Sequence, residues 1–221
     1  VKPDSLPKDI DAAYYLIHSM SSSTSDFDEK EERAVKNFNT YLEPTNCKQV
    51  IYVGGIANEQ SLSKHLWSRK NVENILYQGS AAVTVLRAAI IVGSGSASFE
   101  IIRDLCEKLP LMVTPRWVKT KCQPIAIRDV LNYLTGVLGN KECYNESFDI
   151  GGPYVLSYRE MMEGYARFRK LNLTIVTLPF LSPKISSYWL YFVTSTSYKL
   201  ALNLVDSMRI EVITSDTRLK D

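Results

Sequence analysis

The stretch "LSKHLWSRKNVENIL", residues 62–76, carries a histidine and an arginine four positions apart, a spacing that can serve chemistry. In an α-helix, positions i and i+4 lie on one face, so His65 and Arg69 would point the same way. An imidazole exchanges its proton near neutral pH, which makes His65 a candidate acid or base. A guanidinium can hold a hydroxyl but keeps its proton, so Arg69 is a candidate binding group. The pair therefore predicts a site on this helix.

The segments around this helix predict an α/β fold with a Rossmann-like parallel sheet and flanking helices. Apolar runs at 12–17, 48–55 and 83–93 have the composition of buried strands. The first of them, "AAYYLI", is suited to a strand buried on both faces. Residues 29–42 form an amphipathic pattern with acidic residues in the first turn, as expected of a helix. Strands that alternate with helices over short connections form parallel sheets through right-handed crossovers.

Ligands of such open sheets bind outside the carboxyl ends of the strands. The residues of this chain at or next to those ends are the predicted ligand contacts: His18, Ser19, Gly54, Gly55, Arg87, Ala88, Ala89 and Ile90. For His18 an equal alternative is a polar residue at a strand end that the following serine-rich loop satisfies.

Beyond residue 96 the alternation of strands and helices loosens. We predict helices at 98–109, 128–138 and 157–170, the last with the Ser-x-x-Glu spacing of a capping box, and short strands at 123–127 and 147–152. The expected organisation is a sheet domain over 1–115 and a second region over 116–221, partly interleaved with it. The basic stretch "RWVKTK" at 116–121 could hold a phosphate, but a solvated loop with one packed tryptophan is favoured.

The composition excludes several classes of function. The net charge of +2 is too small to indicate nucleic acid as a partner, and no apolar run has the length of a membrane span. Four cysteines stand far apart without metal-ligand spacing, so we expect no metal and four reduced, mostly buried thiols in a cytoplasmic protein.

Several segments, in order, resemble extended and atypical short-chain dehydrogenase/reductase proteins. "VIYVGGI" resembles the strand that ends in the family's catalytic serine, "HLWSRKNVENIL" its Tyr-x-x-x-Lys helix, and "VTVLRAAIIVG" the strand that follows. "QPIAIRDV" and "FDIGGPYVLSYREM" resemble the substrate-side segments of the epimerase-like members that act on nucleoside-diphosphate sugars. The resemblance implies NAD or NADP as cofactor, held at the strand ends named above, and a small-molecule substrate bound by the second region.

The same resemblance shows that the catalytic residue types are replaced. His65 stands at the tyrosine position, Arg69 at the lysine position, and Gly54 or Gly55 at the serine position. These changes favour an NAD(P)-binding protein with weak or no conventional reductase activity. Two alternatives stay open: an oxidoreductase or epimerase that uses His65 as acid or base on a carbonyl or sugar-nucleotide substrate, and a non-catalytic redox sensor or assembly partner.

The stretch "GSGSAS" at 93–98 lies between a strand and a helix, as a dinucleotide-binding loop would. It lacks the third glycine and the acidic residue roughly 20 positions later that a ribose contact requires. We therefore predict a turn in which one of its serines caps the helix. The resemblance places the true glycine fingerprint in an earlier strand–turn–helix, which we expect to precede Val1 in a longer protein.

That expectation has a consequence for the strand at 12–17. In the family's strand order it would pair with a preceding strand, so in this chain it becomes a bare apolar edge. Bare edges favour association, and we expect this one to be covered, with a homodimer as one arrangement.

Overall fold

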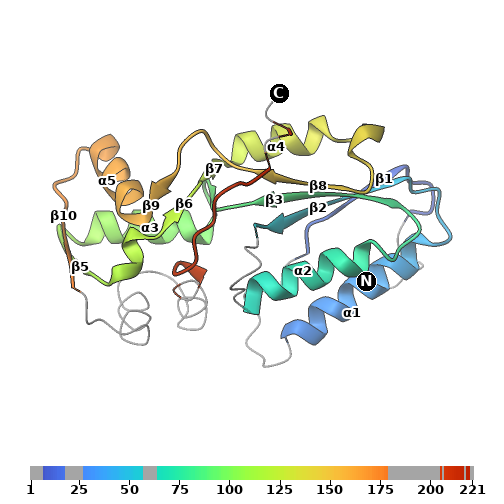
Figure 1. The fold of residues 1–221 in the computed structure, drawn as a ribbon, viewed down its shortest axis with the longest axis horizontal. Coiled ribbons are helices and arrows are strands. Elements are labelled where there is room, and N and C mark those ends of the chain that lie inside the picture. The colour runs from blue at the N-terminus through green and yellow to red at the C-terminus, as the bar shows by residue number, and fades with distance from the viewer. Residues whose placement is uncertain are drawn as a thin grey trace.

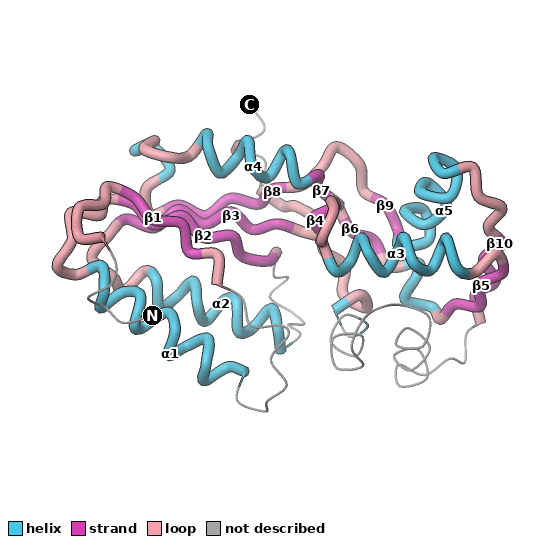
Figure 2. Tube along the Cα trace, turned by 180° about the vertical axis from the view of Figure 1, so that it is seen from behind, coloured by secondary structure: helices cyan, strands magenta, loops and turns pink. Residues whose placement is uncertain are grey.

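The computed structural model of the chain describes residues 7–17, 27–56, 64–178, 205, 207–216 and 218–219. Its centre is a four-stranded parallel sheet (Figures 1 and 2). The strands, in spatial order, are β1 (Ala12–Tyr15), β2 (Gln49–Gly55), β3 (Ala82–Ala88) and β8 (Glu146–Ile150). The predicted Rossmann-like parallel sheet is therefore confirmed.

Helices cover both faces of the sheet (Figures 1 and 2). α1 (Phe27–Leu42) and α2 (Lys64–Leu76) lie on one face, where Tyr15, Val35 and Val72 belong to their shared apolar core. On the other face lies α4 (Ile127–Gly136), over a second core that includes Leu86 and Val130. The sheet is thus the middle of three layers, and each face buries its own set of side chains.

A second lobe lies beyond the carboxyl ends of the sheet strands (Figure 1). Two helices pack together in it, α3 (Ala97–Lys108) and α5 (Tyr158–Arg169). Its short elements are β5 (Leu111–Thr114), the 3-10 turn η2 (Arg116–Lys119), β6 (Lys121–Cys122), β9 (Leu156–Ser157) and β10 (Thr174–Thr177). β10 pairs in parallel with β5.

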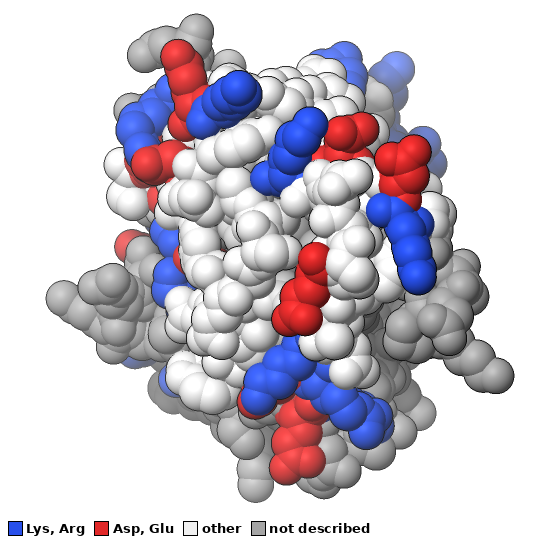
Figure 3. All heavy atoms as spheres, turned by 90° about the vertical axis from the view of Figure 1, so that its right-hand side faces the viewer, with Lys and Arg blue, Asp and Glu red and all other residues white. Residues whose placement is uncertain are grey.

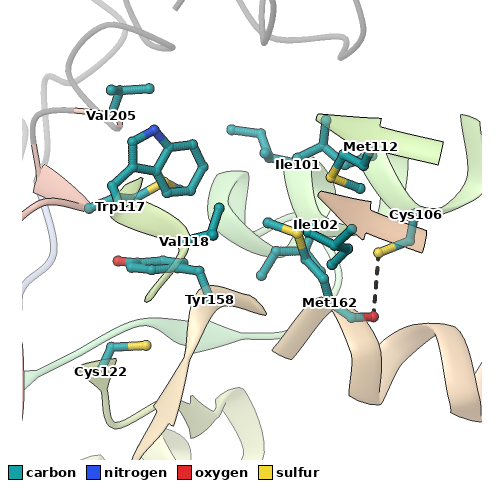
Figure 4. Close-up of a cluster of buried hydrophobic side chains, with 13 residues drawn as sticks. Ile101, Ile102, Cys106, Met112, Trp117, Val118, Cys122, Tyr158, Met162 and Val205 are labelled. Atoms are coloured by element: carbon teal, nitrogen blue, oxygen red, sulfur yellow. Dashed lines mark hydrogen bonds between the residues drawn. The ribbon is translucent and has the colours of Figure 1, made fainter. Parts of the chain in front are cut away.

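The core of this lobe surrounds a tryptophan (Figure 4). Trp117 packs edge-on against Tyr158, with ring centroids 5.9 Å apart, and Val205 lies on its other side. Tyr158 opens α5, and the predicted capping box is present: the Ser157 hydroxyl accepts from the Glu160 N–H while the Glu160 carboxylate accepts from the Ser157 N–H. Trp117 is therefore a packing residue, as the favoured interpretation of "RWVKTK" predicted.

Two expectations about strands are wrong. The run at 83–93 is not one strand: β3 ends at Ala88, and β4 (Ile91–Val92) pairs instead with β7 (Ile125–Ala126). The strand at the sheet edge is also not buried on both faces, because Tyr15 is 2% exposed but Tyr14 is 40% exposed. Among the described residues, β1 has a strand partner on one side only, β2.

The face at the amino ends of the strands carries basic and acidic side chains interspersed (Figure 3). Lys48 and Asp11, for example, lie 3.5 Å apart on the loops that enter β2 and β1. That mixture agrees with the small net charge of the chain, and it gives this face no electrostatic potential of a single sign. No helix in the described part of the chain is long and apolar enough to cross a bilayer.

Candidate functional site

The carboxyl ends of the sheet strands face the second lobe (Figure 1). Gly54 and Gly55 end β2, and Arg87 and Ala88 end β3, so these predicted site residues lie at that edge. Gly54, Arg87 and Asp149 are register partners across β2, β3 and β8, so their side-chain positions share the face that α1 and α2 cover. His18 and Ser19 lie outside the described residues. His65 lies in the first turn of α2, and its side chain is also outside the described part.

The N-terminal half of α2 is fixed from two sides. The Ser68 hydroxyl donates to the Glu31 carboxylate of α1 at 2.6 Å, and both side chains are buried. The Tyr52 hydroxyl of β2 donates to the main-chain carbonyl of Arg69 at 3.4 Å. These contacts hold the turn that bears Arg69 at the strand ends. Glu31 was not among the predicted site residues. Its position one turn before Val35, on the apolar face of a predicted helix, would have indicated a buried carboxylate that needs a partner.

The tyrosines beneath this turn are poor proton donors at neutral pH. Burial, with the negative charge of Glu31, raises the pKa of Tyr15 to about 12. Burial also raises the pKa of Tyr52, although the charge of Arg69 acts in the opposite direction. A catalytic tyrosine requires a lowered pKa. The direction of both pKa shifts disfavours either residue in place of the tyrosine that the Tyr-x-x-x-Lys pattern would supply.

Arg87 is bound to α2. Its Nε and Nη2 atoms donate to the two carboxylate oxygens of Glu73 at 3.2 and 2.6 Å, and Lys70 Nζ donates to the same group at 2.7 Å. Burial raises the pKa of Glu73, but the hydrogen bonds and charges of Arg87 and Lys70 outweigh it and leave this pKa below its ordinary value. The two-pronged pair joins β3 to α2, while a contact of Arg87 with a cofactor stays a prediction.

The other predicted strand-end residues contribute backbone. The Ala88 carbonyl accepts from the Ile56 N–H at 3.2 Å, and the Ile90 carbonyl accepts from the Ile125 N–H at 2.9 Å. A side chain at Gly54 would place its Cβ 3.3 Å from the Tyr52 ring, so the glycine allows that ring to pack close to the strand. Gly55 and Ala89 are partly exposed at the same edge and remain predicted contacts.

The glycine–serine turn at 93–98 makes hydrogen bonds to residues close to it in the sequence. Ser96 stands at the N-cap of α3, but its hydroxyl donates back to the Ile91 carbonyl at 2.7 Å and does not cap the helix, so the expected serine cap is wrong. The Gly95 N–H, at a residue with φ of +82°, donates to the Glu100 carboxylate at 3.2 Å. A carboxylate at this place disfavours a phosphate. The turn is therefore not a dinucleotide-binding loop.

The cysteines and the basic stretch are structural. Three of the four free thiols are buried, as predicted, and burial raises the pKa of Cys106 and of Cys122 to about 12, which keeps them unreactive. In "RWVKTK", Lys121 pairs with Glu160 at 2.8 Å. Within the described residues, no group of three or more His, Cys, Asp or Glu side chains is arranged to hold a metal ion.

Comparisons with solved structures establish the fold. The chain is similar to a nucleoside-diphosphate-sugar epimerase from Staphylococcus aureus, with a TM-score of 0.68 and 13% identity over 90% of this chain and 67% of that one. It is similar to UDP-glucuronic acid 4-epimerase from Bacillus cereus in complex with NAD (TM-score 0.67, 15% identity, 95% of this chain, 76% of that one).

A third similar structure is a short-chain dehydrogenase/reductase superfamily protein from Agrobacterium tumefaciens with bound NAD (TM-score 0.62, 11% identity, 90% of this chain, 79% of that one). No protein-family model and no curated protein matches the sequence. At these identities the likeness defines the architecture: the chain has the Rossmann-like α/β fold that these epimerase and dehydrogenase structures share.

Proposed function

We propose that this chain belongs to an NAD(P)-binding protein of the atypical short-chain dehydrogenase/reductase type, epimerase-like in architecture, with weak or no conventional reductase chemistry. The observation that carries the proposal is the carboxyl edge of the sheet. Near the end of β2, Tyr52 bonds the turn of α2 that bears Arg69, and near the end of β3, Arg87 bonds Glu73 of the same helix. NAD is bound in two of the similar structures. In this proposal residues 1–115 bind the dinucleotide and residues 116–221 bind the substrate.

The described residues fit one end of a dinucleotide. Arg69 supplies a cation and Gly55 and Ala89 supply open backbone at the strand ends, which suits a ribose–nicotinamide moiety. A pyrophosphate needs N–H groups at a glycine-rich helix start, and the described turn of that kind donates to Glu100. We therefore propose that residues 1–221 contact the nicotinamide ribose and bind the whole dinucleotide weakly. The choice between NAD and NADP is left to the test.

The test is a saturation-transfer NMR titration of NADH and NADPH into the protein. We expect weak binding, with transfer to nicotinamide and ribose protons stronger than to adenine protons. Arg69→Ala should remove the transfer, because it deletes the cation at the site. Arg128→Ala, a highly exposed arginine on α4, is the matched control and should leave it unchanged. Transfer confined to the adenine, or micromolar affinity for either nucleotide, would contradict this assignment.

An enzyme that uses His65 as acid or base is the second candidate, because the described residues include a second lobe beside the strand ends and the similar proteins include epimerases. The His65→Gln variant separates the two candidates. A general acid contributes roughly 10²–10⁴-fold to rate, so an enzyme of this kind would lose turnover of a carbonyl or sugar-nucleotide substrate on that scale. We expect His65→Gln to leave both turnover and dinucleotide binding nearly unchanged.

The strand edge and the cysteines bear on the partners of the protein and on its cellular compartment. The exposed edge of β1 favours a homodimer or another covering strand, and four free thiols fit the reducing cytoplasm. We propose both as properties of this protein, with a small molecule and a dinucleotide as its ligands.

A further inference from the structure

The buried hydrogen bond between α1 and α2 joins a serine hydroxyl to a carboxylate, and packing alone does not explain why a carboxylate is buried there. Ser68 Oγ lies 2.6 Å from Glu31 Oε2, and the two residues are 2% and 3% exposed. Glu31 precedes Val35, Phe38 and Leu42 on the stripe of α1 that faces the core. A buried carboxylate loses its hydration, and an apolar side chain at this position would pack the helices without that penalty.

The place of this contact in the fold suggests what it does. Helices α1 and α2 begin where β1 and β2 end, so their N-terminal halves lie at the carboxyl edge of the sheet (Figure 1). Ser68 is adjacent in sequence to Arg69 and one turn after His65. The hydrogen bond therefore acts on the turn of α2 that carries the candidate site.

The opposite ends of the same helices have a comparable contact. Asn39 Nδ2 of α1 donates to the Ile75 carbonyl of α2 at 2.6 Å, near the amino edge of the sheet. Helix α2 is thus held to α1 by a side-chain hydrogen bond at each end. The contact of Glu31 with Ser68 is one residue from Arg69, whereas Asn39 bonds the other end of α2, so Asn39 offers a matched control in the same helix pair.

We propose that Glu31 and Ser68 are positioning residues for the candidate site, which set how the N-terminal half of α2, with His65 and Arg69, lies against α1 and the strand ends. This inference rests on the proposed function and adds two residues to its site. Neither residue needs to touch a ligand. Their effect is to fix the direction in which the site side chains leave the helix.

The experiment compares Ser68→Ala, Glu31→Ala, Glu31→Gln and the control Asn39→Ala by two measurements. The first is NADH binding by saturation transfer, and the second is amide hydrogen exchange in residues 64–69 and 71–76 of α2. Ser68→Ala and Glu31→Ala should weaken NADH binding roughly tenfold, the effect of one lost charge-assisted hydrogen bond, and speed exchange in 64–69. Glu31→Gln keeps an oxygen that accepts from Ser68 but loses the charge, so both readouts should lie between those of Glu31→Ala and those of the unaltered protein.

Asn39→Ala should lower the urea midpoint but speed exchange only in 71–76 and leave NADH binding intact. Equal losses of binding in Ser68→Ala and Asn39→Ala would overturn the positioning role, because any weakening of the helix pair would then suffice. If the unaltered protein binds no dinucleotide, the proposed function fails. In that case the amide exchange of Ser68→Ala still tests the positioning role. Faster exchange confined to residues 64–69 supports it, and faster exchange across residues 64–76 overturns it.

Discussion

At the scale of single residues, the described part of the site is organised by buried carboxylates. Glu73 accepts from both nitrogens of the Arg87 fork and from Lys70, while Glu31 accepts from Ser68. Each carboxylate ties α2 to a different element, β3 or α1. These carboxylates are the contacts by which we propose that the candidate site residues on α2 are positioned.

Glu73→Ala should destabilise the protein by about 3 kcal/mol near neutral pH, since it leaves the half-buried charge of Arg87 without its partner. The pKa of Glu73 is lowered in the folded protein, so its stabilising effect is complete above the ordinary value of 4.5 and is lost as the pH falls below it. Urea unfolding at pH 7 and at pH 3.5 measures this, and the difference between variant and parent should shrink in acid. Asp11→Ala, which removes a solvent-exposed pair with Lys48, is the control and should leave the midpoint unchanged. An equal difference at both pH values would contradict the assignment.

At the scale of elements, the sheet and the second lobe are joined by segments that cross between them and bond to each other. The Gly152 N–H donates to the Pro124 carbonyl at 3.0 Å, and the Gln123 side chain donates to the Gly152 carbonyl at 2.6 Å. Gln123 Oε1 accepts from the N–H and hydroxyl of Thr214 near the C-terminus. A Cβ at Gly152 would collide with the Pro124 backbone, and a Cβ at Gly151 would crowd the side chains of Gln123 and Thr214. The "GGP" stretch is therefore a packing feature of the crossing.

Gly152→Ala should cost about 3 kcal/mol or prevent folding, since the added Cβ would collide with the Pro124 carbonyl oxygen. Thermal unfolding followed by circular dichroism measures the loss. The control is Gly136→Ala at the end of α4, where a Cβ meets no atom within 4 Å and should stabilise the helix by about 0.5 kcal/mol. Similar melting temperatures for the two variants would show that the crossing is looser than these contacts imply.

At the scale of the whole molecule, the two lobes meet at the carboxyl ends of the sheet strands. Strand β1 forms one lateral edge of the same sheet. Leu16 and Ile17, which follow this strand, are 59% and 55% exposed, and Tyr14 is also exposed. An apolar strand edge of this kind is a template for pairing with another chain.

We expect the protein to associate through this edge. Light scattering should show a mass that rises with concentration, and amides of residues 12–15 should exchange slowly in the associated form. Leu16→Lys places a charge at the edge and should shift the protein towards monomer, while Leu131→Lys, an equally exposed leucine on α4, should not. A concentration-independent monomer with fast exchange across 12–15 would refute the expectation.

The order of the sheet strands and of the α-helices, the parallel sheet and the capping box of α5 were predictable from the sequence, because periodicity, caps and strand–helix alternation are local properties. The pairing of Arg87 with Glu73 and of Ser68 with Glu31, the end of β3 at Ala88, and the one-sided burial of β1 were decided by tertiary structure. Each depends on which neighbour lies across a sheet or a helix pair, and residues 14 to 37 positions apart in sequence supply those hydrogen bonds. Local pattern predicts which face a side chain takes, but the free energy of burying a charge depends on the partner it meets there.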